Sequence, residues 1–338
     1  MQYGFMHNHI LIELSGESQS LARAEIEGAM NALDSGKILD YEDCVAIAEY
    51  SGDIQELVNR LALAHSVSIY SQSAQDVKDI DLSNVKPLGN SFRIRARRIM
   101  EYRKEVDISG LERSLGKLIK GKVNLTNPDY EVRVLLGKRV HVGVLKPSWK
   151  IDRTSYELRK AQNRPFFSPI TLHPKFARAL VNLTSVRKGE WILDPFCGTG
   201  GILLECGLIG AKIIGSDVSL QMVDGTKKNL SHFGLNGIIF ESEIGEISDN
   251  LEKIGLSKVD YIATDPPYGR AATTLGENIY QLYERSFYQF KKILSRKMAI
   301  ILPNDESISI CKRFFQLERR IQVKVHRSLT RHFCVFSA

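Results

Sequence analysis

In the second half of the chain, short apolar runs alternate with longer stretches of helical periodicity. The apolar runs occupy residues 190–193, 211–215, 237–241, 259–263 and 298–302. The helical stretches occupy residues 175–183, 202–208, 220–233, 277–294 and 307–315. Continuous apolar runs are typical of strands buried on both faces. With two more strand-like runs at 321–326 and 332–336, the pattern predicts a seven-stranded, mostly parallel sheet whose last strand is antiparallel.

The first half of the chain follows a different order. Strand-like alternation at 8–15, 44–50 and 66–71 is interrupted by helical spacing at 21–33 and 54–64. A strand at 92–98, a helix at 111–119 and a hairpin follow, and the hairpin joins 131–136 to 140–145 through Gly137, Lys138 and Arg139. This mixture predicts an α+β module ahead of the parallel sheet.

Domain boundaries are expected where these patterns change. Residues 147–165 are rich in Lys, Arg, Ser and Pro and have weak periodicity, which is typical of a linker. A chain of 338 residues is long enough for two or three domains. We therefore predict an accessory domain at 1–50, a second domain at 51–148, a linker at 149–164 and the parallel-sheet domain at 165–338.

Composition adds constraints on location and on metals. No apolar run approaches the ~18 residues of a membrane span, so we expect no membrane association. The five cysteines are odd in number and scattered, and none has CxxC spacing. This usage indicates a cytoplasmic protein in a reducing compartment, with neither a disulfide framework nor a zinc or other metal site.

Positive charge is concentrated in the middle of the chain. Residues 86–164 contain 20 lysines and arginines against 8 aspartates and glutamates, whereas the preceding residues are net acidic. A basic module of this kind indicates contact with a phosphate backbone, and a solvated cationic face is the alternative. Period two places alternate arginines on one strand face. The candidate nucleic-acid-binding residues are Arg93, Arg95, Arg97, Arg98, Lys117, Lys120 and Lys122.

A glycine-rich turn, Asp194 to Gly201, joins the strand at 190–193 to the following helix. Glycines let a ligand approach the backbone, and the helix N-terminus offers free N–H groups. The leading Asp194 would repel a pyrophosphate but suits a ligand with an ammonium group. S-adenosylmethionine (SAM) carries an ammonium group and a sulfonium cation. After the next strand, Asp217 is placed to accept the ribose hydroxyls of a nucleoside.

The strand at 259–263 runs into Asp265-Pro266-Pro267-Tyr268. A carboxylate and a backbone carbonyl can accept both N–H groups of an exocyclic amine and aim its lone pair outward. We assign these roles to Asp265 and the Pro266 carbonyl, while the prolines remove competing donors. Tyr268 can stack on a base held out of its helix. The alternative is a turn that caps the strand.

The predicted catalytic residues are therefore Asp265, Pro266, Pro267 and Tyr268. The predicted cofactor-binding residues are Asp194, Phe196, Gly198, Thr199, Gly200, Asp217, Glu243 and His173. Two assignments remain open. Either Glu241 or Glu243 can accept from the adenine amine, and either can be a solvated loop acid. His173 can equally be a packing residue.

Two resemblances add to this reading. The segments FRIRARR, KVNLTNPD and YEVRVLL, within residues 50–150, resemble a THUMP domain, an RNA-binding module that recognises the acceptor end of tRNA. With Asp-Pro-Pro-Tyr behind it, the whole chain resembles the archaeal tRNA (guanine(10)-N2)-methyltransferase family. The resemblance implies a class I, Rossmann-like, SAM-dependent methyltransferase domain behind a THUMP module. It also implies a tRNA substrate and mono- or dimethylguanosine as product.

Other functions are compatible with the same motifs. The Asp-Pro-Pro-Tyr motif selects an exocyclic amine but does not distinguish guanine from adenine or cytosine. The target could be another guanosine of tRNA or rRNA, such as position 6 of tRNA, or an amine in DNA or protein. A non-catalytic RNA-binding subunit is the third alternative. The sequence identifies no surface for a protein partner.

Overall fold

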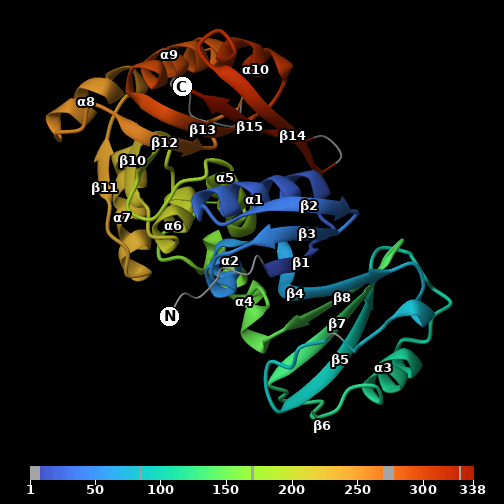
Figure 1. The fold of residues 1–338 in the computed structure, drawn as a ribbon. Coiled ribbons are helices and arrows are strands. Elements are labelled where there is room, and N and C mark those ends of the chain that lie inside the picture. Colours follow the sequence, from blue (N-terminus) through green and yellow to red (C-terminus); the bar gives the residue numbers. More distant parts are fainter. Residues whose placement is uncertain (1–7, 84, 169–170, 269–277, 327–328) are drawn as a thin grey trace, which may run out of the picture. The chain divides into compact units, whose positions relative to one another are not determined.

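The computed structural model describes residues 8–83, 85–168, 171–268, 278–326 and 329–338 (Figure 1). The chain divides into two compact units, Met1–Asp152 and Arg153–Ala338. Each unit has its own sheet. Among the described helices, none is long and apolar enough to cross a membrane.

The first unit contains eight strands and three α-helices in its described part. In chain order they are β1 (Asn8–Leu14), α1 (Gln19–Ala32), β2 (Gly36–Glu42), β3 (Val45–Tyr50), α2 (Ile54–Arg60), β4 (Ala64–Ala74), β5 (Ser91–Arg98), α3 (Ile108–Gly116), β6 (Lys122–Val123), β7 (Tyr130–Leu136) and β8 (Val140–Leu145). The strands and helices expected from periodicity are all present. Strand β2 was not expected, because its Lys, Asp, Tyr and Glu residues hide the alternation.

One sheet runs through the whole first unit, in the order β2-β3-β1-β4-β8-β7-β5-β6. Strand β4 joins the two predicted domains within that sheet, because it pairs with β1 on one side and with β8 on the other. Strand β5 is parallel to β6 and β7, and β7 is antiparallel to β8. The predicted boundary between a domain at 1–50 and a domain at 51–148 therefore falls within one continuous sheet. This boundary stays a prediction.

The second unit begins inside the predicted linker. Residues 149–164 include α4 (Arg153–Leu158), whose Tyr156 is buried beneath the guanidinium of Arg159 at 4.4 Å. The remaining elements are α5 (Pro174–Leu183), β9 (Trp191–Asp194), α6 (Gly201–Leu208), β10 (Lys212–Asp217), α7 (Leu220–His232), β11 (Ile238–Glu241), α8 (Ile247–Lys253), β12 (Val259–Thr264), α9 (Ile279–Ile293), β13 (Leu294–Leu302), α10 (Asp305–Cys311), β14 (Gln316–His326) and β15 (Leu329–Ser337).

The second sheet has seven strands in the order β11-β10-β9-β12-β13-β15-β14. The neighbouring pairs among β11, β10, β9, β12 and β13 are parallel, whereas β15 is antiparallel to both β13 and β14. The predicted mostly parallel sheet with an antiparallel last strand is confirmed. Because β9, β10 and β12 are parallel, their carboxyl ends meet at one edge, where Asp194, Asp217 and Asp265 stand.

The sheet of the second unit is buried by helices. Residues of β9, β10, β12 and β13 form a core with α8, α9 and α10, in which Tyr283, Phe287 and Phe290 are fully buried. Figure 1 shows α9 and α10 beside the red end of the sheet. Burying each such ring contributes about 1.5–3 kcal/mol, so this core fixes the strands that carry the three aspartates.

Candidate functional site

The glycine-rich turn depends on two glycines with positive φ. Gly198 has a φ of 51° and Gly200 a φ of 78°, a region that side chains with a Cβ rarely adopt. A Cβ on Gly200 would also stand 2.9 Å from Cγ2 of Thr226. The Thr226 hydroxyl in turn donates to the Gly198 carbonyl at 2.8 Å. The turn is therefore shaped by α7 as well as by its own glycines.

Asp194 ends β9 beneath this turn and is almost completely buried. Its Oδ1 accepts hydrogen bonds from the Thr264 hydroxyl at 2.7 Å and from the Phe196 backbone N–H at 3.2 Å. Burial raises the pKa of Asp194 to about 7, and the nearby carboxylates of Asp265 and Asp217 act in the same direction. Among the described residues, none supplies a positive charge that lowers this pKa.

Asp217 ends β10 and faces the same turn. Its Oδ2 accepts from the Gly198 N–H at 2.9 Å, and its Oδ1 accepts from the Ser219 N–H at 3.0 Å. Burial raises the pKa of Asp217 as well. Together with Asp194 and Asp265, it concentrates negative charge at the carboxyl edge of the sheet. A ligand with two positive centres and a ribose fits this set of groups.

A cavity lies between the turn and the segment that precedes α5. Its lining residues are Thr171, Leu172, Asp194, Phe196, Cys197, Gly198, Thr199, Gly201, Ile202 and Asp265. The structure therefore brings the glycine-rich turn and the Asp265 loop to one cavity. Sequence reasoning missed Thr171 and Leu172, although it named the adjacent His173 as a candidate cofactor contact.

The Asp265 loop is held by two tyrosines. The Tyr268 hydroxyl donates to Asp265 Oδ1 at 2.5 Å, and the Tyr283 hydroxyl of α9 donates to the Pro267 carbonyl at 2.7 Å. No described residue donates to the Pro266 carbonyl. Burial raises the pKa of Asp265 to about 6. It also raises the pKa of Tyr268, so this phenol remains protonated and donates to the carboxylate.

Two predicted cofactor contacts have other partners. His173 caps the N-terminus of α5, where its Nδ1 accepts from the Lys175 N–H at 3.3 Å. Glu243 accepts from the Gly245 N–H at 2.6 Å and pairs with Arg285 at 2.6 Å. Arg285 and burial act in opposite directions, and the net result lowers the pKa of Glu243. Their roles toward a cofactor stay predictions.

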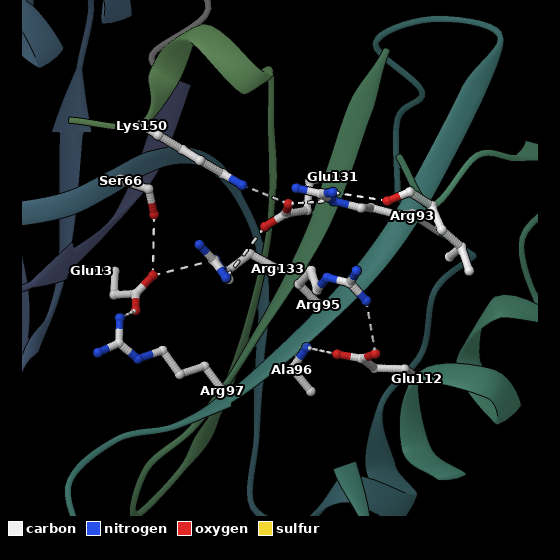
Figure 2. Close-up of polar contacts among 11 residues, drawn as sticks. Glu13, Ser66, Arg93, Arg95, Ala96, Arg97, Glu112, Glu131, Arg133 and Lys150 are labelled. Atoms are coloured by element: carbon white, nitrogen blue, oxygen red, sulfur yellow. Dashed lines mark hydrogen bonds and ion pairs between the residues drawn. The ribbon is translucent and has the colours of Figure 1, made fainter. Parts of the chain in front are cut away.

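The arginine row of β5 points along one face, as predicted, but acidic partners engage it (Figure 2). Arg93 pairs with Glu131 at 2.9 Å, Arg95 with Glu112 at 3.2 Å and Arg97 with Glu13 at 2.7 Å. Glu13 and Glu131 are buried beneath the row and also pair with Arg133; Lys150 pairs with Glu131.

Arg98 lies on the opposite face of β5. Its Nε donates to the Arg103 carbonyl at 3.1 Å, and its Nη2 donates to the Lys104 carbonyl at 3.3 Å. These bonds hold the loop that follows β5. Arg98 therefore has a local structural role, and phosphate contact by it stays a prediction.

The predicted lysines have more freedom than the arginines. Lys117, Lys120 and Lys122 are exposed. Lys117 is the C-cap of α3, Lys120 lies in the segment that follows, and Lys122 is the first residue of β6. Beside them is a cavity of about 400 Å³ between α3 and β5. Its lining residues are Phe92, Ile94, Arg95, Ser109, Glu112, Arg113, Gly116, Lys117, Val123 and Leu125. An apolar hollow with a cationic rim suits an unpaired nucleotide.

Comparisons with known proteins were made on sequence and on structure. A family model described as "RMKL-like, methyltransferase domain" matches residues 161–332, and a model described as "DNA methylase" matches residues 85–228. The first match contains Asp194 and Asp265, whereas the second ends before Asp265.

Two archaeal proteins match over nearly their whole length. The tRNA (guanine(10)-N2)-dimethyltransferase of Pyrococcus abyssi is 33% identical over 97% of this chain and 99% of its own length. The protein of the same name from Methanothermobacter thermautotrophicus is 34% identical over 95% of this chain and 97% of its own. Among solved structures, TrmN from Thermus thermophilus aligns with a TM-score of 0.54 at 20% identity, covering 97% of this chain and 99% of that one. The structural match supports the fold alone.

Proposed function

This chain belongs to the tRNA (guanine(10)-N2)-dimethyltransferase family, and on that premise we propose that it methylates the exocyclic N2 amine of guanosine 10 in tRNA. The methyl donor is SAM, and the second unit has the class I, Rossmann-like fold of SAM-dependent methyltransferases. A first transfer gives monomethylguanosine and a second gives dimethylguanosine. We further propose a cytoplasmic enzyme, and the names of its tRNA-modifying relatives support this.

One observation carries the proposal. Asp265 and the glycine-rich turn line the same cavity, so an amine acceptor and a cofactor site adjoin each other. Asp265 Oδ1 is engaged by Tyr268, which leaves Oδ2 for one N–H of the amine. The Pro266 carbonyl, to which no described residue donates, can take the other N–H. An amine held by these two acceptors has its lone pair aimed away from them.

The residues of the chain bind the cofactor and hold the amine. Asp194 carries the charge that attracts the ammonium group, while Asp217 accepts the ribose hydroxyls. When bound, SAM supplies a methyl group whose bond to sulfur breaks as the amine nitrogen's lone pair forms the new bond, and sulfur retains the electron pair. Asp265 then accepts the proton that the methylated nitrogen releases. Positioning and electrostatics provide the rate enhancement.

The first unit holds the tRNA in this proposal, as a THUMP-type module. Its support is the cationic excess of residues 86–164 and the hollow beside Lys117, Lys120 and Lys122. Because buried glutamates fix Arg93 and Arg97, we assign phosphate contact first to the lysines. The arginines contribute through those N–H groups that remain exposed.

The test is mass spectrometry of nucleosides from unmodified tRNA incubated with the enzyme and labelled SAM. The expected products are N2-methylguanosine and N2,N2-dimethylguanosine at position 10. A transcript with inosine at position 10 lacks the amine and should accept no methyl group there. Asp265→Ala should bind SAM but transfer nothing. Methylation at position 6, or of DNA in place of tRNA, would contradict the proposal.

A further inference from the structure

A side chain distant in sequence reaches the catalytic loop. Arg331 lies near the start of β15, and its Nη2 is 3.8 Å from Asp265 Oδ2. Its guanidinium carbon lies 5.9 Å from the centroid of the Tyr268 ring. The side chains of Arg331 and Asp265 are each 15% exposed. Arg331 Nε is buried and has no hydrogen-bond partner among the described residues. Among the described residues, the guanidinium therefore lies beside both Asp265 and Tyr268, the two side chains of the catalytic loop that it interacts with.

The topology of the sheet explains why Arg331 is there. Strands β12 and β13 are parallel, so their carboxyl ends at Thr264 and Leu302 lie along the same edge. Strand β15 runs the other way and pairs His332 with Leu302. Its first residues consequently lie at the edge where Asp265 follows β12. An antiparallel strand inserted next to β13 is thus a means of bringing Arg331 to this loop.

The two oxygens of the Asp265 carboxylate have different surroundings. Oδ1 accepts the short hydrogen bond from Tyr268 at 2.5 Å. Oδ2 is 3.8 Å from Arg331 Nη2, which is within ion-pair range but too long for a hydrogen bond. A donor can still approach Oδ2. The oxygen left for the substrate amine is therefore the one beside the positive charge.

We propose that Arg331 is a positioning residue for the methyl transfer, whose charge keeps Asp265 ionised and keeps Oδ2 an acceptor for the amine. The inference rests on the proposed function and adds a residue outside the catalytic loop. A protonated carboxyl donates from one oxygen, which is then a much weaker acceptor for an N–H. Burial favours the protonated form, so a buried acceptor at this position requires an opposing charge.

The groups that face Asp265 come from several elements. Tyr268 of the same loop and Tyr283 of α9 are phenols whose pKa values burial raises, so both are uncharged at neutral pH. Asp194 of β9 is a like charge. Among the described residues that shift the pKa of Asp265, Arg331 is the cation, and it opposes the effect of burial. Removing its charge should therefore raise the pKa of Asp265.

The experiment compares wild type with Arg331→Met and Arg331→Lys. The rate of methyl transfer to tRNA is measured from about pH 5.5 to 8.5 at saturating SAM and tRNA. Loss of a charge at this distance shifts a carboxyl pKa by about one unit or more. From a pKa of about 6, Arg331→Met should lose roughly fivefold or more at pH 6 and recover toward pH 8.5. Arg331→Lys retains the positive charge, so the fall in its transfer rate toward low pH should occur close to the pH at which it occurs in wild type. We call this fall the acid limb of the pH–rate profile.

The controls separate this role from a structural one. Arg320→Met removes an arginine of β14 that pairs with Asp305 instead, and its acid limb should not move. SAM affinity and thermal unfolding are measured for each variant. An equal loss at every pH, or an unmoved acid limb in Arg331→Met, would overturn the inference. Wild type would remain active in either case, so the proposed function would stand. If Arg331→Met unfolds at the assay temperature, the pH–rate profile of Arg331→Lys becomes the test. An acid limb of Arg331→Lys that lies one pH unit or more from that of wild type would overturn the inference.

Discussion

The pH dependence of SAM affinity provides a test of the acidic cavity. Burial raises the pKa of Asp194 to about 7, so much of this carboxyl is protonated in the free protein below that pH. An ammonium group binds the ionised form. The sign is therefore fixed: SAM affinity is fully present above the pKa of Asp194 and is lost as the pH falls through it.

The size of the effect follows from the ionised fraction. With a pKa of about 7, this fraction rises about 25-fold between pH 5.5 and 7.5. The dissociation constant of SAM should fall by a similar factor over that range, in which an α-amino group stays mostly protonated. The ionised fraction of Asp265, with a pKa of about 6, rises about fourfold over the same pH range. Attraction between Asp265 and the sulfonium would lower the dissociation constant of SAM by up to that further factor.

Isothermal titration calorimetry at several pH values, in two buffers of different ionisation enthalpy, measures both the affinity and the protons released. Asp194→Asn should bind SAM more weakly at pH 7.5 and retain a pH dependence of about fourfold at most. Asp224→Asn, at an exposed position on α7, is the matched control and should behave as wild type. A flat pH dependence in wild type, or the full dependence in Asp194→Asn, would refute the reasoning.

Three further outcomes are expected. Asp265→Asn should lower the transfer rate by about 100-fold or more while SAM affinity stays within a few-fold, and parallel losses in both assays would contradict its role as the amine acceptor. Replacing Lys117, Lys120 and Lys122 with glutamine should reduce the magnitude of the slope of log tRNA affinity against log salt by about 2 to 3, as measured by filter binding. An unchanged slope would show that these lysines do not contact the tRNA backbone. Arg97→Met should lower the free energy of unfolding by about 1–3 kcal/mol in urea titrations, because a buried glutamate loses a partner, and wild-type stability would show that Arg133 suffices.

Much of the second unit was predictable because its strands are continuous apolar runs. Strands such as β9 and β12 are buried on both faces, and the residue at the end of each run points to the carboxyl edge. The order of Asp194, Asp217 and Asp265 along the chain therefore predicted a shared site. Periodicity did not reveal α8, whose short sequence mixes polar and apolar residues.

The partners of the charged residues could not be predicted in the same way. The arginine alternation of β5 correctly placed Arg93 and Arg97 on one face. Their partners Glu131 and Glu13 come from other strands, and Glu13 lies far away in the sequence. Arg331 was missed for the same reason. Its position depends on β15 inserting between β13 and β14, and hydrophobic periodicity does not determine the order of strands in a sheet.

The insertion of β15 also governs the order of assembly. Strand β14 is made earlier but contacts the rest of the sheet through β15, so it has no place to dock until the later strand has been synthesised. During translation, the ribosome must therefore extrude residues 329–337 before this edge of the sheet can close. Arg331 arrives with the same segment. In the role proposed for Arg331, a nascent chain that has already formed its cofactor cavity would still lack the charge beside Asp265 until this hairpin has been made.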